Sequence, residues 1–155
     1  MNEVNVSKSC EYGLKAMLYI ASKSAQDHTS TLDEISIHIG SPMAFTSKIL
    51  QQLKRHQLLM SIKGKSGGYL IEKEKLSQIN LFQIVSALEG DELFTKCGLG
   101  LGMCNSKNPC PIHNEYSIIR NNLKTMLKNN FLKNNIEQLN KGKTTLLRST
   151  NILNI

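Results

Sequence analysis

The chain has 155 residues, enough for one domain with a sizeable core or one domain and an oligomerisation arm, but cramped for two independent domains. Lysine and arginine outnumber aspartate and glutamate by 19 to 12, and the resulting formal charge of +7 favours a polyanionic partner. We recognise no N-terminal signal sequence and no apolar run long enough to cross a membrane, so we expect a cytoplasmic protein with no membrane partner.

The N-terminal part of the chain predicts a pair of helices. Residues 7–23 carry apolar side chains at helical spacing, and Cys10 lies on that stripe, which indicates a small buried thiol. A second helix is predicted to begin after Thr31, because Thr31 and Glu34 match a capping box in which each side chain bonds the other residue's backbone N–H. Gly40 supplies the permissive backbone that ends this helix.

A third helix is predicted directly after this glycine. Ser41 and Pro42 are typical of an N-cap followed by the first helical residue. The inward stripe of the helix comprises Phe45, Ile49, Leu50 and Leu53. The polar side chains, which have no apolar reason to be buried, are Thr46, Ser47, Lys48, Gln51 and Gln52. Two short helices joined by a tight glycine turn match a helix-turn-helix, although any helical hairpin shares that pattern.

The next segment predicts a β-hairpin with a basic tip. Residues 58–62 and 69–71 are strand candidates, and the loop between them, 63–68, is rich in glycine. Glycines let a phosphate approach the backbone, and Lys63 and Lys65 supply positive charge. The hairpin therefore fits the wing of a winged helix-turn-helix, and it shifts the interpretation of the helix pair toward DNA binding.

Two further helices and a tail follow. A short helix over 79–88 ends at Gly90 and is expected to pack the hairpin against the body. A long helix over 115–139 has one apolar face, formed by Tyr116, Ile119, Leu123, Met126 and Leu127. This face predicts a homodimer, which suits a palindromic DNA site, although the helix could instead fold back onto its own domain. The tail is basic and asparagine-rich, as disordered segments often are.

The predicted class is mainly α with a small β wing, a winged helix-turn-helix with a long C-terminal dimerisation helix. The sequence contains no repeat of the length used by solenoid proteins. The expected organisation is a DNA-binding domain over 1–90, a cysteine-rich loop over 91–114, a dimerisation helix over 115–139 and a basic tail over 140–155.

Three of the four cysteines lie in the predicted loop, at Cys97, Cys104 and Cys110, and His113 follows them. In a reducing compartment such a group indicates metal binding or redox chemistry rather than structural disulfides. Zinc usually pairs its ligands at closer spacing, whereas an iron–sulfur cluster accepts ligands spread along a loop, including one that is not cysteine. A metal-free thiol switch is the third interpretation. No orienting acid accompanies Cys110 and His113, so the sequence does not predict an enzyme.

The chain resembles the Rrf-type bacterial winged-helix transcriptional regulators in four segments: residues 11–21, 61–69, 79–90 and the cysteine loop that ends with residues 109–113. In members of that family three loop cysteines bind a 2Fe–2S or 4Fe–4S cluster, and the resemblance places these ligands at Cys97, Cys104 and Cys110. The resemblance also implies a fourth ligand. The two candidates are His113 and Glu11, the latter supplied by the partner subunit.

The resemblance implies a DNA-binding repressor whose operator affinity is set by the cluster, which would sense redox state, nitric oxide or iron–sulfur status. The residues implied to contact DNA are Ser41, Ala44, Phe45, Ser47, Lys48, Lys63, Lys65 and Ser66. Phe45 is equally expected in the core, because it lies on the apolar stripe. The residues alone leave two alternatives: a cluster-free regulator that responds to thiol oxidation, a metabolite or a partner protein, and a zinc-stabilised interaction module that binds no DNA.

Overall fold

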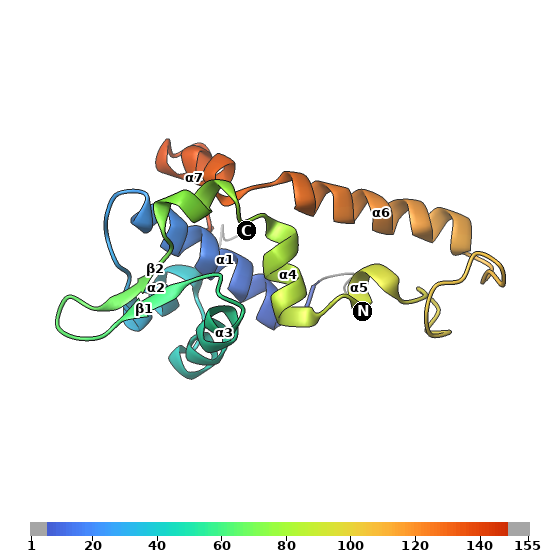
Figure 1. The fold of residues 1–155 in the computed structure, drawn as a ribbon, viewed down its shortest axis with the longest axis horizontal. Helices are drawn as coiled ribbons and strands as arrows, with labels where there is room; N and C mark the ends of the chain where they lie inside the picture. The colour runs from blue at the N-terminus through green and yellow to red at the C-terminus, as the bar shows by residue number, and fades with distance from the viewer. Residues whose placement is uncertain (1–5, 149–155) are drawn as a thin grey trace, which may run out of the picture.

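Residues 6–148 are described by the structure, a computed structural model of the chain (Figure 1). In chain order the elements are α1 (Lys8–Ser24), α2 (Leu32–Ile39), α3 (Met43–Arg55), β1 (Met60–Ile62), β2 (Gly68–Leu70), the 3-10 helix η1 (Lys73–Ser77), α4 (Leu81–Glu89), α5 (Glu92–Thr95), α6 (His113–Asn129) and α7 (Leu132–Asn140). The predicted class, mainly helical with a small β wing, is confirmed. No helix within residues 6–148 is long and apolar enough to span a bilayer.

The chain divides into a body and an arm. The body consists of α1 to α4, the β-hairpin, η1 and α7, and the arm consists of residues 91–129, which include α5, the cysteine loop and α6. Helix α6 extends away from the body, and the cysteine loop lies at its far end (Figure 1). A small cluster that includes Cys10, Val85, Phe94 and Leu127 joins the arm to the body. The interpretation of Cys10 as a buried thiol is confirmed.

Helix α2 begins where the capping box predicts. Thr31 Oγ1 accepts a hydrogen bond from Glu34 N at 3.2 Å, and Glu34 Oε2 accepts one from Thr31 N at 2.8 Å. At the other end Gly40 has a φ of 68°, in the left-handed region that favours glycine. The apolar sides of α1, α2 and α3 meet in the main core, where Ile35 and Leu50 are fully buried.

Helix α3 begins one residue later than predicted. Pro42 is its N-cap and makes no side-chain capping bond, and Ser41 is buried with Oγ 3.5 Å from the Pro42 carbonyl oxygen, so the prediction of Ser41 as N-cap was wrong. The interpretation of Thr46 as a side chain with no reason to be buried was also wrong. Thr46 is fully buried because its hydroxyl donates to the Pro42 carbonyl at 3.0 Å, which satisfies the polar atom inside the core.

The hairpin forms the predicted wing, with β1 and β2 antiparallel and Ser61 opposite Tyr69. The strands are shifted toward the tip by a residue or two, because Leu58 and Leu59 turn into the core before β1 begins. Ser30 and Tyr69 exchange backbone hydrogen bonds of 2.9 and 2.7 Å, so the segment before α2 pairs with β2. Gly68 permits this pairing: a Cβ there would lie 2.6 Å from the Ser30 carbonyl oxygen.

Helix α4 does not have the partner we expected. It was predicted to pack the hairpin against the body, but it packs mainly against α1, α3 and α6. At Gly13 of α1 the two helices lie close enough that a Cβ would meet the side chain of Leu88. The hairpin is held instead by the Ser30–Tyr69 pairing and by contacts between β2 and α1.

The predicted single helix over 115–139 is two helices, α6 and α7, so that prediction was wrong. Between them the chain is extended and pairs with the segment before α4: Leu81 N donates to the Asn130 carbonyl at 2.9 Å, and Leu132 N donates to the Ile79 carbonyl at 3.0 Å. Helix α7 then folds back along α1 (Figure 1). Its side chains Leu132 and Ile136 are buried. Within residues 6–148, α6 is then the long helix that extends from the body, and part of it packs on α4.

The predicted basic tail begins within the described residues and ends outside them. After α7 the chain turns, with Gly142 N bonded to the Leu139 carbonyl at 2.9 Å, and Leu146 packs against the main core. The part of the tail over 141–148 is therefore in contact with the body. The remainder of the segment for which disorder was predicted, residues 149–155, lies outside the described residues.

Candidate functional site

The exposed face of α3 carries several of the residues predicted to contact DNA. Ala44 and Lys48 are exposed near the start of the helix, and Ser47 is half-buried. Phe45 is different, because its ring packs edge-on against Tyr12 of α1 with the ring centres 5.8 Å apart. Phe45 therefore helps to hold α3 on the body. Ser41, buried against the Pro42 backbone, offers little surface to a ligand.

The surface around α3 and the wing has a charge pattern that the motif analysis missed. The chain contains no acidic residue from Ile35 to Ile71, and this stretch carries Lys48, Lys54, Arg55, Lys63 and Lys65. Lys54 Nζ donates to Ser61 Oγ at 2.5 Å, so a cation on α3 also touches β1. A continuous stretch without carboxylates was the signal in the sequence that pointed to Lys54 and Arg55.

The wing tip presents the other predicted DNA contacts. Lys63, Lys65 and Ser66 are all exposed. The tip is tied back to the body, because Thr29 Oγ1 donates to the Ser66 carbonyl at 3.3 Å. Together with the Ser30–Tyr69 pairing, this bond fixes the direction in which the tip lysines project relative to α3.

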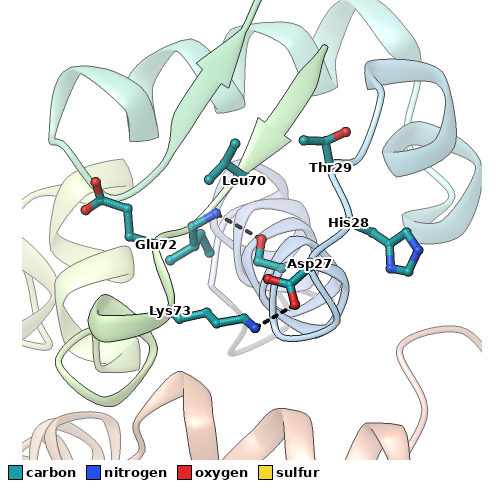
Figure 2. A pocket seen from close by; sticks show the side chains of 8 residues that line it. Asp27, His28, Thr29, Leu70, Glu72 and Lys73 are labelled. Atoms are coloured by element: carbon teal, nitrogen blue, oxygen red, sulfur yellow. Dashed lines mark hydrogen bonds and ion pairs between the residues drawn. The ribbon is translucent and has the colours of Figure 1, made fainter. Parts of the chain in front are cut away.

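A hollow of about 230 Å³ lies where β2 leaves the wing, and Figure 2 shows the side chains around it. Ile71 N donates to Ser24 Oγ at 2.9 Å, and Lys73 Nζ lies 2.7 Å from Asp27 Oδ2. Both contacts join the end of the hairpin to the end of α1. Because these two contacts connect lining residues from the hairpin end and the α1 end, we interpret the hollow as a structural junction that braces the wing.

The arm brings four of the predicted metal ligands together. Cys97, Cys104, Cys110 and His113 line one hollow of about 200 Å³, and Cys104 Sγ lies 3.2 Å from His113 Nδ1. His113 is the first residue of α6, whereas the cysteines belong to the loop before it. Within residues 6–148, no three His, Cys, Asp or Glu side chains are arranged to hold a single metal ion.

The thiols of this hollow differ in their readiness to ionise. Hydrogen bonds from the Leu101 and Leu99 backbones lower the pKa of Cys97, and Arg120 adds to the effect. Desolvation raises the pKa of Cys110, and the neighbouring Cys97 raises it further. Cys10 in the body contrasts with both, because burial and the nearby Glu89 raise its pKa to about 12. Cys97 is thus better prepared than Cys110 or Cys10 to act as a thiolate ligand or nucleophile.

Glu11, the other candidate for a fourth ligand, lies elsewhere in the chain. It is on α1, within 2.9 Å of Lys8 and 3.1 Å of Lys15, and its hydrogen bonds to these lysines lower its pKa. It does not line the hollow of the cysteines. Any role as a ligand would require a second copy of the chain to bring its α1 to this loop.

The predicted dimerisation stripe on α6 is divided between two faces. Leu127 is buried and Leu123 is half-buried, and both pack toward α4 and Phe94. Tyr116 is half-buried against the cysteine loop. Ile119 and Met126 are exposed, and they are joined on the outer side by Ile118, which sequence reasoning missed.

Comparison with known proteins places this geometry in a family. The family model Rrf2, described as an iron-dependent transcriptional regulator, matches residues 6–138. The helix-turn-helix regulator IscR of Cronobacter sakazakii is 29% identical over 118 residues, which are 76% of this chain and 71% of that protein.

Solved structures show the same fold. CymR, the global cysteine regulator of B. subtilis, superposes with a TM-score of 0.72 at 20% identity, covering 86% of this chain and 97% of CymR. IscR of T. potens superposes with a TM-score of 0.71 at 17% identity, covering 92% and 93% of the two chains. The family match runs from α1 into α7, and the relatives are regulators of transcription. This chain therefore belongs to the Rrf2 family of DNA-binding transcriptional regulators and is not an enzyme.

Proposed function

We propose that the chain is a homodimeric repressor that binds a palindromic operator and whose affinity is set by an iron–sulfur cluster on the arm. The observation that carries the proposal is the hollow lined by Cys97, Cys104, Cys110 and His113. The relatives named IscR and the description of the family as iron-dependent support it.

In this proposal α3 enters the major groove and the wing follows the phosphate backbone. Ala44, Ser47 and Lys48 face the base edges, because they occupy the first turns of α3 and project away from the core. Lys63 and Lys65 neutralise phosphates, and the glycines between and after them allow a close approach of the backbone. The stretch without carboxylates keeps this surface free of repulsion toward DNA.

The donors in the hollow fit a cluster better than a single zinc ion. Thiolates and an imidazole are the soft ligands that iron–sulfur clusters accept. A cluster spreads its ligands over several iron atoms, so the thiols do not have to converge on one point, as a single ion would require. When bound, the cluster supplies one-electron chemistry and reactivity toward nitric oxide and oxygen. His113 is the fourth ligand that we favour, because it already lines the hollow and lies close to Cys104.

The contacts between α3 and α4 give the arm a route to the DNA-binding surface. Gln52 Nε2 on α3 donates to the carbonyls of Ala87 and Leu88 at 2.9 and 3.3 Å. These carbonyls are at the end of α4, which leads through Gly90 directly into the arm, and α4 also packs against α6. A change in the loop that shifts α6 would therefore bias the position of α3, which is the two-state coupling that the proposal needs.

The dimer in this proposal forms through the outer face of α6. Ile118, Ile119 and Met126 are exposed there, on the one long helix that leaves the body. A two-fold contact along α6 would bury this apolar face and set two copies of α3 on successive half-sites, as a palindromic operator requires.

The test is anaerobic purification followed by iron and sulfide analysis, visible absorption and operator binding before and after removal of the cluster. We expect a coloured protein with iron and sulfide bound, and a change in operator affinity when the cluster is lost. The variant with Cys97→Ala, Cys104→Ala and Cys110→Ala should lose iron and the change in affinity. Cys10→Ala is the matched control for iron binding, because Cys10 is buried outside the hollow and should leave the iron content unchanged.

A colourless anaerobic preparation without iron would contradict the proposal. A preparation with one zinc per chain and no affinity for DNA would instead support the zinc-stabilised interaction module. The second candidate is a cluster-free regulator, favoured by the presence of Cys97 and Cys110 in the same hollow, where the two thiols influence each other's pKa. A thiol-specific oxidant would join these two sulfurs in a disulfide, taking up two electrons while two protons are released. Loss of operator binding on such oxidation, in protein that never held iron, would establish that candidate.

A further inference from the structure

Arg120 of α6 holds the cysteine loop on both sides of Cys97. Its Nη1 donates to the Lys96 carbonyl at 3.1 Å. Its guanidinium also lies 5.7 Å from the centre of the Tyr116 ring, and that ring lies against Gly98, where a Cβ would be 3.0 Å from the ring carbons. One side chain therefore fixes the backbone before Cys97 directly and the backbone after it through Tyr116.

The backbone that Arg120 holds organises the rest of the loop. Cys97 N donates to the Gly102 carbonyl and Cys104 N donates to the Thr95 carbonyl, both at 2.8 Å, around a bridge between residues 96 and 103. The first two cysteines are thus the ends of a short paired segment. The Lys96 carbonyl belongs to this paired segment. Its bond to Arg120 therefore attaches the whole segment to α6.

Arg120 also places a charge and a spare donor beside the thiols. Its positive charge acts on Cys97, which is next to the carbonyl that it binds. Its Nε is buried and has no hydrogen-bond partner within the described part of the chain. A buried donor without a partner is costly in free energy. An anionic group brought to the loop would accept a hydrogen bond from this N–H and remove that cost.

We propose that Arg120 is the positioning residue of the cysteine site: it anchors the loop to α6 and gives a cluster held there a fixed positive charge. The anchoring concerns the chain alone, whereas the effect on the cluster rests on the proposed function. Positive charge stabilises the more anionic, reduced form of a cluster, so Arg120 raises its reduction potential.

The anchoring is tested by hydrogen exchange in the apo-protein. Arg120→Gln should speed amide exchange in the peptide over 96–104 several-fold, because the Lys96 carbonyl loses its partner. Arg120→Lys should also speed it, since a lysine cannot reproduce the fork that spans the carbonyl and the ring. The matched control is Lys124→Gln, which removes a charge one turn later, beside Phe82, and should leave the peptide unchanged. Exchange at the wild-type rate in Arg120→Gln, in protein with an unaltered melting curve, would overturn the anchoring.

The effect of the charge is tested by redox titration of cluster-loaded protein. Arg120→Gln should shift the midpoint potential to a more negative value, and Arg120→Lys should shift it less, although both loosen the loop. An unchanged midpoint potential in Arg120→Gln, or a shift no larger than that of Lys124→Gln, would overturn the proposed effect of the Arg120 charge on the cluster. If the wild type binds no iron, the proposed function and the charge effect fail together, while the exchange experiment still decides the anchoring.

Discussion

The body and the arm differ in how far they bury their apolar side chains. In the body most of the large aliphatic side chains of α1, α2 and α3 are enclosed, with Ile20, Ile35 and Leu50 fully buried, whereas Ile37 and Met43 are exposed. In the arm most of the large aliphatic side chains are exposed; they are Leu99, Leu101, Met103, Ile112, Ile118, Ile119 and Met126. The body is thus a closed fold, whereas the arm presents surface that its own chain does not cover.

This difference agrees with the proposed function, in which the arm and not the body depends on other molecules. The body supplies its own caps, core and pairing, so its DNA-binding surface is held without help. The arm combines an open apolar helix face with a loop of thiols, and contiguous exposed apolar surface of this kind marks an interaction site. In the proposed function the arm is where a second copy and a cofactor act, and the first three experiments below set a change in one region against a change in the other.

The largest contrast in stability should come from truncating a leucine in each region. Leu50→Ala leaves a cavity in the main core and should reduce the free energy of unfolding by about 2–5 kcal/mol. Leu101→Ala in the arm, where the side chain is 69% exposed, should change it by less than about 0.5 kcal/mol. Urea unfolding followed by circular dichroism measures both. Equal losses in the two variants would mean that the arm is packed as firmly as the body.

The next contrast concerns association. Ile119 on α6 and Ile37 on α2 are each 64% exposed, so they form a matched pair. Ile119→Asp should weaken the proposed dimer at least tenfold, about 1.4 kcal/mol, because it places a charge in the apolar contact. Ile37→Asp should leave association unchanged. Sedimentation equilibrium measures both constants, and dissociation caused by the change on α2 alone would move the dimer contact from the arm to the body.

Charge on the wing should matter more for DNA binding than charge on the arm. Lys63→Gln and Lys65→Gln should each reduce the slope of log affinity against log salt by about one, because each lysine neutralises one phosphate in the proposed complex. Lys128→Gln is the comparison in the arm, where the lysine lies 4.9 Å from the centre of the Phe82 ring. Fluorescence anisotropy across a salt series gives the slopes. If Lys128→Gln reduced the salt slope as much as the two wing variants do, the arm would also contact DNA.

The regions also differ in how far the sequence predicts them. In the body the signals were local: a capping box at Thr31, a left-handed glycine at Gly40 and a glycine-rich hairpin define elements through neighbours in sequence. In the arm the cysteine spacing predicted a shared site, and the structure gathers those side chains in one hollow. The role of Arg120 gave no such signal, because its partner at Lys96 is far away in sequence.

The predictions that were wrong depended on contacts that local sequence patterns do not report. The helix over 115–139 is broken because Asn130 and Leu132 pair with the backbone before α4, a contact that no periodicity reports. Thr46 is buried because the Pro42 carbonyl accepts its hydroxyl, so a polar residue became compatible with the core. Ser41 and Thr31 both precede helices of the helix-turn-helix and looked alike in sequence, yet only Thr31 forms a cap.

The smallest expected effect tests that last distinction within the body. Thr31→Ala removes the hydroxyl that accepts from Glu34 N and should lower the free energy of unfolding by about 1 kcal/mol. Ser41→Ala, the control, should cost less, because Ser41 caps no helix. Thermal unfolding at neutral pH compares them. A larger loss for Ser41→Ala would mean that the serine stabilises the turn more than the cap stabilises α2.

The same capping box also predicts how stability changes in acid. This pH dependence separates the bond that Glu34 accepts from the bond that Thr31 accepts. The backbone hydrogen bond from Thr31 is the main cause that lowers the pKa of Glu34, so the stabilisation is complete above the ordinary glutamate pKa of about 4.3 and is lost as pH falls through the lowered value. Thr31→Ala keeps the backbone N–H and should retain this acid dependence. Glu34→Gln should weaken the dependence, because an amide bonds the same N–H without titrating. Matched acid profiles for the wild type and Glu34→Gln would show that other carboxylates, such as Glu11 with its two lysines, dominate the loss of stability in acid.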